Sequence, residues 1–145
     1  MQRVQRASVT VEGRLVAAIG PGLAALIGVA PDDGPADIDY TASKIREMRV
    51  FADEQGRMNR SVGDAGGSVL LVSQFTLFGD LRRGRRPGFS AAAPPEMARA
   101  RFDDLVQRMR GTGVPVETGV FQAHMQVELV NDGPVTILLD SRKTF

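Results

Sequence analysis

Two short polar segments interrupt apolar runs and hold the residue types best suited to chemistry. The first, Ser73-Gln74-Phe75-Thr76, follows the apolar run at residues 68–72. A hydroxyl at the end of a buried strand acts as a nucleophile when a base is adjacent, and main-chain N–H groups there can bind an oxyanion without one. Both options stay open, because His124 is the single imidazole and no spacing brings it to this segment.

The second segment is NDGPVT, residues 131–136, between alternating runs at 125–130 and 135–139 that predict strands. Pro134 has no N–H for a strand ladder, so it belongs at an edge, bulge or turn. Gly133 has no side chain, which opens the main chain to close approach by another molecule. Gly-Pro alone is typical of a hairpin turn, whereas its pairing with the first polar segment favours a binding role.

The most basic stretch is residues 79–90, in which four arginines flank Gly84 and precede Pro87-Gly88-Phe89. These arginines are Arg82, Arg83, Arg85 and Arg86. Such a loop is equally typical of a solvated surface and of phosphate binding. The net charge is only +1, so any affinity for nucleic acid must come from a local patch.

The composition excludes several classes of site. The absence of cysteine removes disulfides, thiolate nucleophiles and Cys-ligated metals, and one histidine excludes a multi-His metal site. No dinucleotide, Walker A or HExxH pattern occurs. No run has the length of a membrane span or the character of a signal peptide. We therefore expect a cytoplasmic protein with no metal and no cofactor.

The predicted elements are those of one mixed domain. Strands are predicted at 4–11, 14–19 and 23–29, and these three would form a meander. Further strands are predicted at 51–58, 68–72 and 114–117, and in the last two alternating runs, 125–130 and 135–139. Helices are predicted at 37–50 and 96–110. This order predicts a single α/β domain over residues 1–145, with a curved, mostly antiparallel, barrel-like sheet and two helices.

Three stretches carry a resemblance to a known family: RVQRASVTVEGR with IGPGLAALIGV, then GGSVLLVSQFTLFGDLRRGRRPGFS, then MQVELVNDGPVT. Nearly the whole chain resembles the D-aminoacyl-tRNA deacylases, whose two signature motifs are SQFTL and NDGPVT. The resemblance implies that family's fold and a homodimeric, cytosolic, tRNA-binding hydrolase of translation quality control. Its substrates would be the ester of a D-amino acid with the terminal adenosine of tRNA, and glycine mischarged on tRNA-Ala.

The resemblance also implies roles for the two motifs. Gly133-Pro134 would be a cis peptide inserted into the active site of the partner subunit, where it admits D-amino acids and rejects L-amino acids, and Arg6 would brace it. The catalytic segment would be Ser73, Gln74, Phe75 and Thr76, with main-chain N–H groups around Phe75 and Thr76 stabilising the oxyanion. Water would attack the ester with help from the tRNA 2′-hydroxyl.

Further residues follow from the same resemblance. Phe89, Phe121 and Met125 would wall the adenosine pocket, and Arg82, Arg83, Arg85 and Arg86 would contact phosphates of the tRNA acceptor end. Two residues depart from the family pattern: Gln122 stands where the family usually has Gly, and His124 stands where it commonly has an acidic residue. These two differences would change the local shape of the pocket. We expect a peripheral or structural role for His124.

Four alternatives come from other classes. A non-catalytic RNA-binding module would share the arginine loop, although the chain has one Tyr, seven Phe and no Trp, and no aromatic stacking platform. A structural dimerisation protein would use NDGP as an ordinary trans turn. A Ser/Thr hydrolase would use Thr76 as its nucleophile. A related editing enzyme would remove a different misattached residue and have a trans Gly-Pro.

Overall fold

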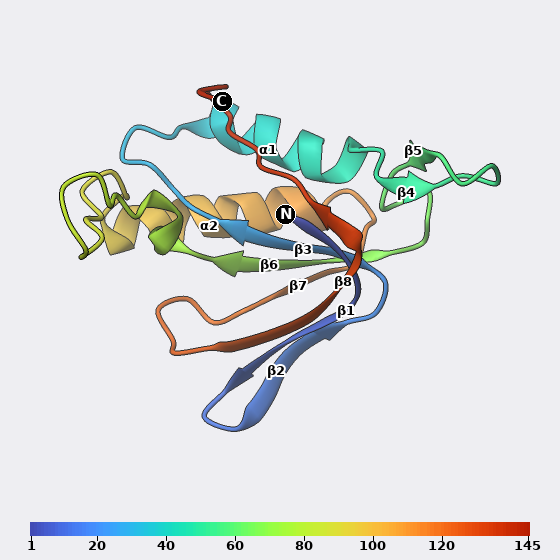
Figure 1. The fold of residues 1–145 in the computed structure, drawn as a ribbon, viewed down its shortest axis with the longest axis horizontal. Helices are drawn as coiled ribbons and strands as arrows, with labels where there is room; N and C mark the ends of the chain where they lie inside the picture. Colours follow the sequence, from blue (N-terminus) through green and yellow to red (C-terminus); the bar gives the residue numbers. More distant parts are fainter.

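A curved sheet with two helices on one side forms the fold of residues 1–145, as described by the computed structural model (Figure 1). The strands of the main sheet are β1 (Gln2–Val11), β2 (Arg14–Ile19), β3 (Gly22–Ile27), β6 (Ser68–Ser73), β7 (Val116–Thr118) and β8 (Gln126–Thr136). The helices α1 (Pro35–Glu47) and α2 (Pro95–Arg110) cover the β3 and β6 part of the sheet, and the small hairpin of β4 (Phe51–Ala52) and β5 (Met58–Arg60) follows α1.

Strand β3 up to Ala25 and the central residues of β6 are buried on both faces, which explains their continuous apolar sequences. Leu23 and Leu71 face the helices, in a core that includes Ile45, Phe102 and Met109. The alternate residues of these strands face the inside of the curled sheet, where a second core holds Val4, Ala7, Val9, Ala17, Ile19, Ala24, Leu70 and Val72. The α/β fold with a barrel-like, curved sheet and two helices is therefore confirmed.

The predicted three-stranded meander is wrong, because β3 does not lie beside β2. Ala7 is opposite Ile19 in the β1–β2 pair, and Val4 is opposite Gly22 in the β1–β3 pair. Strands β2 and β3 therefore lie end to end along the same edge of β1, in the same antiparallel register, with residues 20–21 between them. The sheet is mixed, since β3 pairs with β6, and β6 with β7, in parallel.

The last two predicted strands form one strand, β8, paired antiparallel with the opposite edge of β1. Asn131 is opposite Val4 and Thr136 is opposite Gln2, so five steps along β8 match two along β1. Residues 132–135 therefore loop out as a bulge, in which the Gly133–Pro134 peptide bond is cis. The hairpin interpretation of Gly-Pro is wrong, because β8 continues past it.

The helices agree with prediction to within a few residues. Helix α1 begins at Pro35, where Asp37 accepts a hydrogen bond from the Gly34 N–H, and it ends three residues before the predicted end because Met48 takes an extended ψ of 123°. Proline at the first position is favourable because its missing N–H has no partner in a helix start. Neither helix has the length and hydropathy needed to cross a membrane.

Candidate active site

The first polar segment lies where β6 ends and the chain turns. Ser73 is opposite Ile27 of β3, and the Gln74 N–H donates to the Ile27 carbonyl at 2.7 Å. A 3-10 turn, η1 (Phe75–Phe78), follows directly, so residues 75–78 do not continue the strand. The first hydrogen bond of the turn runs from the Leu77 N–H to the Gln74 carbonyl at 3.3 Å. The N–H groups of Phe75 and Thr76 precede that bond, at the start of the turn.

The side chains of this segment have no base to activate them. Gln74 Nε2 donates to Thr76 Oγ1, and no carboxylate or imidazole hydrogen-bonds either Ser73 or Thr76. His124 is exposed, on the connection between β7 and β8. Because a Ser or Thr nucleophile needs an adjacent base, the geometry favours use of the main chain at this segment.

Among the three predicted pocket walls, Phe89 contacts the turn directly. Its ring meets that of Phe75 edge to face, with centroids 5.0 Å apart, and Phe75 is 56% exposed. A Cβ on Gly79 would lie 3.3 Å from the Phe89 ring and 3.1 Å from the Thr76 carbonyl oxygen. Residues 79 and 89 therefore pack closely against the turn.

Phe121 and Met125 are half-buried and pack against core residues. The Phe121 ring lies 6.4 Å from the Phe102 ring, and the Arg99 guanidinium lies 4.6 Å from its centroid. A Cβ on Gly119 would lie 2.7 Å from the Met125 sulfur. Both residues belong to the connection between β7 and β8; Phe121 packs against Val29 and Ala93, and Met125 packs against the core that includes Val72.

The arginine loop is closed at its base and holds one of its own arginines. Asp80 and Gly88 exchange two backbone hydrogen bonds of 2.8 and 2.9 Å. The Arg82 guanidinium donates to both carboxylate oxygens of Asp80, at 2.9 and 2.7 Å, and lowers the pKa of Asp80 to about 2. The other arginines of the loop are exposed and make no ion pair: Arg83, Arg85 and Arg86.

The β8 bulge is held in place from both of its flanks. Asn131 Oδ1 accepts the Val135 N–H at 2.8 Å across its base. Arg3 Nε donates to the Asp132 carbonyl at 3.0 Å and lies 3.4 Å from the Asp132 carboxylate, while Arg3 Nη1 donates to the Val50 carbonyl at 2.5 Å. Gly133, with φ of 146°, has no room for a side chain, because a Cβ would lie 2.6 Å from Val135 Cγ2. Gly133 and Pro134 themselves are exposed.

Within the protomer, Arg3 is the arginine that contacts the bulge, and the bracing role that the resemblance implies for Arg6 stays a prediction. Arg6 is exposed, lies opposite Val130, and makes no hydrogen bond to the bulge. Recognition that the first and last strands pair would have pointed to Arg3, because it lies opposite the looped-out residues.

The two motifs lie at opposite ends of the sheet in one protomer (Figure 1). Asn131 is opposite Val4, Val4 is opposite Gly22, and Gly22 is opposite Ser68, the first residue of β6. Ser73 lies at the other end of β6, about 16 Å further along at the usual rise per strand residue. A protomer's own bulge therefore does not reach its own η1 turn.

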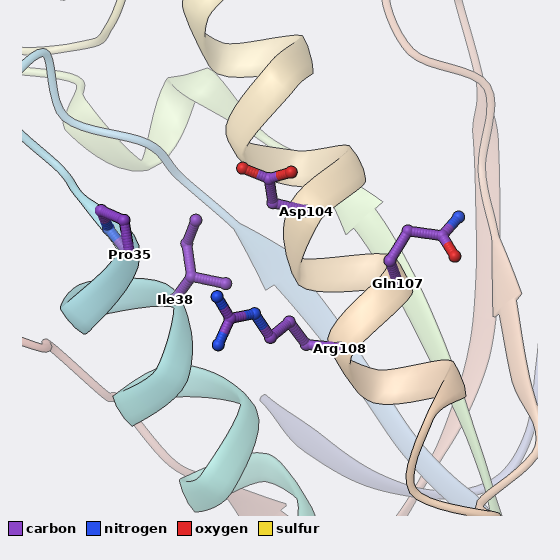
Figure 2. Close-up of a pocket in the computed structure, with 5 residues that line it drawn as sticks. All are labelled: Pro35, Ile38, Asp104, Gln107 and Arg108. Carbon is purple, nitrogen blue, oxygen red and sulfur yellow. The ribbon is translucent and has the colours of Figure 1, made fainter.

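A groove of about 360 Å³ lies between the two helices, away from both motifs (Figure 2). Its lining residues are Pro35, Ile38, Asp104, Gln107 and Arg108. The Arg108 side chain is paired with Asp39, and none of the predicted site residues lines the groove. No cluster of His, Cys, Asp or Glu able to hold a metal ion occurs in the structure.

Comparisons with known proteins identify the family and the fold. A family model described as D-Tyr-tRNA(Tyr) deacylase matches residues 1–140. A D-aminoacyl-tRNA deacylase of Symbiobacterium thermophilum is 61% identical over 145 residues, which cover all of this chain and 96% of that protein. The solved structure of a c-Myc DNA unwinding element binding protein has a TM-score of 0.89 and 42% identity, covering 94% of this chain and 93% of that one.

A structure of a probable eukaryotic D-amino acid tRNA deacylase shares the fold, with a TM-score of 0.70 and 17% identity over 92% of both chains. Fold, sequence and relatives together define the chain as a hydrolase. It belongs to the D-aminoacyl-tRNA deacylase family, as the two sequence motifs predicted.

Proposed function

We propose that the chain hydrolyses D-aminoacyl-tRNA at a site completed by a second copy of itself. Family membership supports the deacylase reaction on an aminoacyl-tRNA. The observation that carries the finer proposal is the separation of the two motifs within a protomer, with the exposed bulge at one end of the sheet and the η1 turn at the other. In a symmetric homodimer, each bulge enters the partner's site and two equivalent sites result.

Selection against L-amino acids is assigned to the Gly133–Pro134 main chain of the partner subunit. Its carbonyl groups hold the substrate ammonium, so that the hydrogen on the substrate Cα faces the bulge and a D-side chain points outward. An L-side chain collides with the same main chain, and rejection by collision needs no recognition of the side chain itself. Glycine has no side chain to collide, so glycine mischarged on tRNA-Ala is a substrate as well.

Hydrolysis is assigned to water, with the N–H groups of Phe75 and Thr76 donating to the ester oxygen as it gains negative charge. The 2′-hydroxyl of the terminal ribose assists the water. Addition of the water oxygen to the carbonyl carbon gives a tetrahedral intermediate. Collapse of this intermediate breaks the bond to the ribose oxygen, which takes the proton released by the water and leaves as the free tRNA hydroxyl. Ser73 and Gln74 line the site. The lack of a base beside Thr76 supports a route without an acyl-enzyme.

The tRNA is held by its terminal adenosine and its acceptor phosphates. Phe89, Phe121 and Met125 form the adenosine pocket, of which Phe89 is already in contact with Phe75. The arginine loop contacts phosphates through Arg83, Arg85 and Arg86, while Arg82 is engaged by Asp80. The reaction takes place in the cytoplasm and needs no metal or cofactor.

The first test is single-turnover deacylation of D-Tyr-tRNA and L-Tyr-tRNA, each with EDTA present. Rapid loss of the D-ester with the L-ester intact is the expected result. Loss of both esters at similar rates would contradict selection by the bulge. Binding of tRNA with no cleavage of either ester would favour an RNA-binding module, and a trapped acyl-enzyme would favour Thr76 as nucleophile.

The shared site is tested by mixing two inactive variants. Gly133→Val damages the bulge and leaves the turn intact, whereas Phe75→Pro removes one N–H of the turn and leaves the bulge intact. Proline is tolerated at the first position of a helical turn, and Phe75→Ala is the matched control that loses the ring and keeps the N–H. After subunit exchange, half the dimers are mixed and have one intact site, so roughly a quarter of wild-type activity returns. No recovery would show that bulge and turn act within one subunit.

A further inference from the structure

The last residues of the chain are folded against the loop between β3 and α1, with the C-terminus over the start of α1 (Figure 1). We call residues 140–145 the C-terminal strap; all but Asp140 lie beyond the part matched by the family model. The Asp140 carboxylate accepts the N–H groups of Arg142 and Thr144, at 3.1 and 3.0 Å, and the Thr144 hydroxyl. These bonds fix the backbone of the strap around Arg142.

Arg142 binds three aspartates of the loop and of the first turn of α1. Its guanidinium pairs with the Asp32 carboxylate and donates to the Asp32 carbonyl at 2.7 Å. It also lies 3.4 Å from the Asp33 carboxylate and 3.9 Å from the Asp37 carboxylate. No other cation pairs with any of these three carboxylates, so Arg142 alone offsets their mutual repulsion at contact distance.

Asp33 links this cluster to the fold of the loop. Its carboxylate accepts the Ala30 N–H at 2.8 Å, and its own N–H donates to the Ala30 carbonyl at 3.2 Å. Arg101 of α2 donates to the Asp33 carbonyl at 3.1 Å. The position of Asp33 therefore sets the path of residues 30–33.

The other end of the same loop supports the η1 turn. The Gln74 N–H donates to the Ile27 carbonyl at 2.7 Å, and the Ala93 N–H donates to the Val29 carbonyl at 2.8 Å. Between these bonds, Gly28 packs under Phe78, since a Cβ there would lie 2.8 Å from Phe78 Cε2. Both ends of the segment that contains the turn and the arginine loop are thus fastened to residues 27–29.

We infer that Arg142 is a positioning residue for the hydrolytic site. By holding Asp32 and Asp33, it fixes the loop on which η1 rests and so the direction of the Phe75 and Thr76 N–H groups. The inference rests on the proposed function, because it assigns those N–H groups to the transition state. A misplaced N–H donor lowers kcat more than it weakens substrate binding, because the oxyanion forms only in the transition state.

The test compares Arg142→Met, Arg142→Lys and the control Lys143→Met. The two methionine variants remove one charge each from adjacent positions of the strap, so their long-range attraction to tRNA changes equally. The Lys143 ammonium contacts only the Tyr40 ring, at 5.8 Å from its centroid. Amide hydrogen exchange is followed at Ala30, Asp33, Gln74 and Ala93, and kcat and KM are measured with D-Tyr-tRNA.

For Arg142→Met we expect exchange about fivefold faster at these amides and kcat about fivefold lower, with KM changed less than about twofold. Arg142→Lys should restore part of the amide protection and part of kcat. Lys143→Met should match wild type in exchange rates, kcat and KM. An unchanged kcat, or a loss of thermal stability alone, would overturn the inference, as would a KM increase shared by both methionine variants. If wild type cleaves no D-ester, the proposed function fails, while the exchange rates still decide whether Arg142 holds the loop and the turn.

Discussion

The rings of Phe75 and Phe89 meet edge to face, 5.0 Å between centroids and at 73°. One ring belongs to the turn whose N–H groups are assigned to the oxyanion, and the other follows the arginine loop. The contact therefore joins the part of the site that would hold phosphate to the part that would hold the ester.

Replacement of Phe89 by leucine is expected to weaken this connection. An edge-to-face pair contributes about 0.5–1.5 kcal/mol beyond its buried area, so kcat/KM for D-Tyr-tRNA should fall by roughly three- to tenfold. Phe145→Leu, at an exposed ring, is the matched control and should leave kcat/KM unchanged. An equal loss in both variants would contradict a specific role for the pair.

Replacement of Arg3 or of Arg6 tests which of the two arginines supports the β8 bulge. Arg3→Met removes hydrogen bonds to the Asp132 and Val50 carbonyls, and hydrogen bonds from charged donors contribute about 1.5–3 kcal/mol each. We expect at least about tenfold lower activity on the D-ester, with Arg6→Met close to wild type. Circular dichroism of both variants checks that they fold. Greater loss in Arg6→Met would return the bracing role to that residue, acting across the subunit interface.

The lowered pKa of the Asp80 carboxylate predicts how the stability of the arginine loop depends on pH. Its pKa is about 2, below the ordinary 3.8, chiefly because the Arg82 side chain donates to the ionised form. A lowered pKa means that the contact stabilises the folded loop above pH 3.8 and that this contribution is lost as the pH falls through about 2. A carboxyl NMR titration should find the Asp80 midpoint near 2, and Arg82→Gln should move it toward 3.8. Between pH 5 and 8 this group should cause no change in activity.

The salt dependence of tRNA binding should report on the free arginines. Each phosphate neutralised contributes about 0.7–0.9 to the slope of log affinity against log salt. Combined replacement of Arg83, Arg85 and Arg86 by glutamine should therefore reduce the slope by about 2–3. Arg82→Gln alone should leave the slope nearly unchanged, because Arg82 is held by Asp80. A decrease of about 0.7–0.9 from Arg82→Gln alone would show that tRNA displaces Asp80 and that Arg82 neutralises a phosphate.

Local sequence patterns predicted the elements well where short-range physics decides them. Periodicity located α1, α2 and the strands, and Pro95 at the first position of α2 marks its start. The apolar sequences of β3 and β6 indicated burial on both faces, which the two cores explain. The two polar interruptions identified the candidate site without any structure.

Local sequence patterns could not predict which strands pair when they are far apart in the sequence. Nothing local indicates that residue 4 lies opposite residue 131, so the sequence did not show that Gly133 and Pro134 loop out of a continuous strand or that Arg3 supports them. The turn at Phe75 was missed because apolar and polar residues alternate there as in a strand, whereas packing of Phe78 on Gly28 accompanies a 3-10 turn.

The pairing of β1 with β8 also has a consequence for biosynthesis. Residues 2–10 find their partners at residues 126–136, so the first strand leaves the ribosome long before its neighbour on that edge exists. Pairings this distant in sequence are slow to form because a long loop must close first. One edge of strand β1 therefore stays unpaired until residues 126–136 have been made, and the sheet can close only after that.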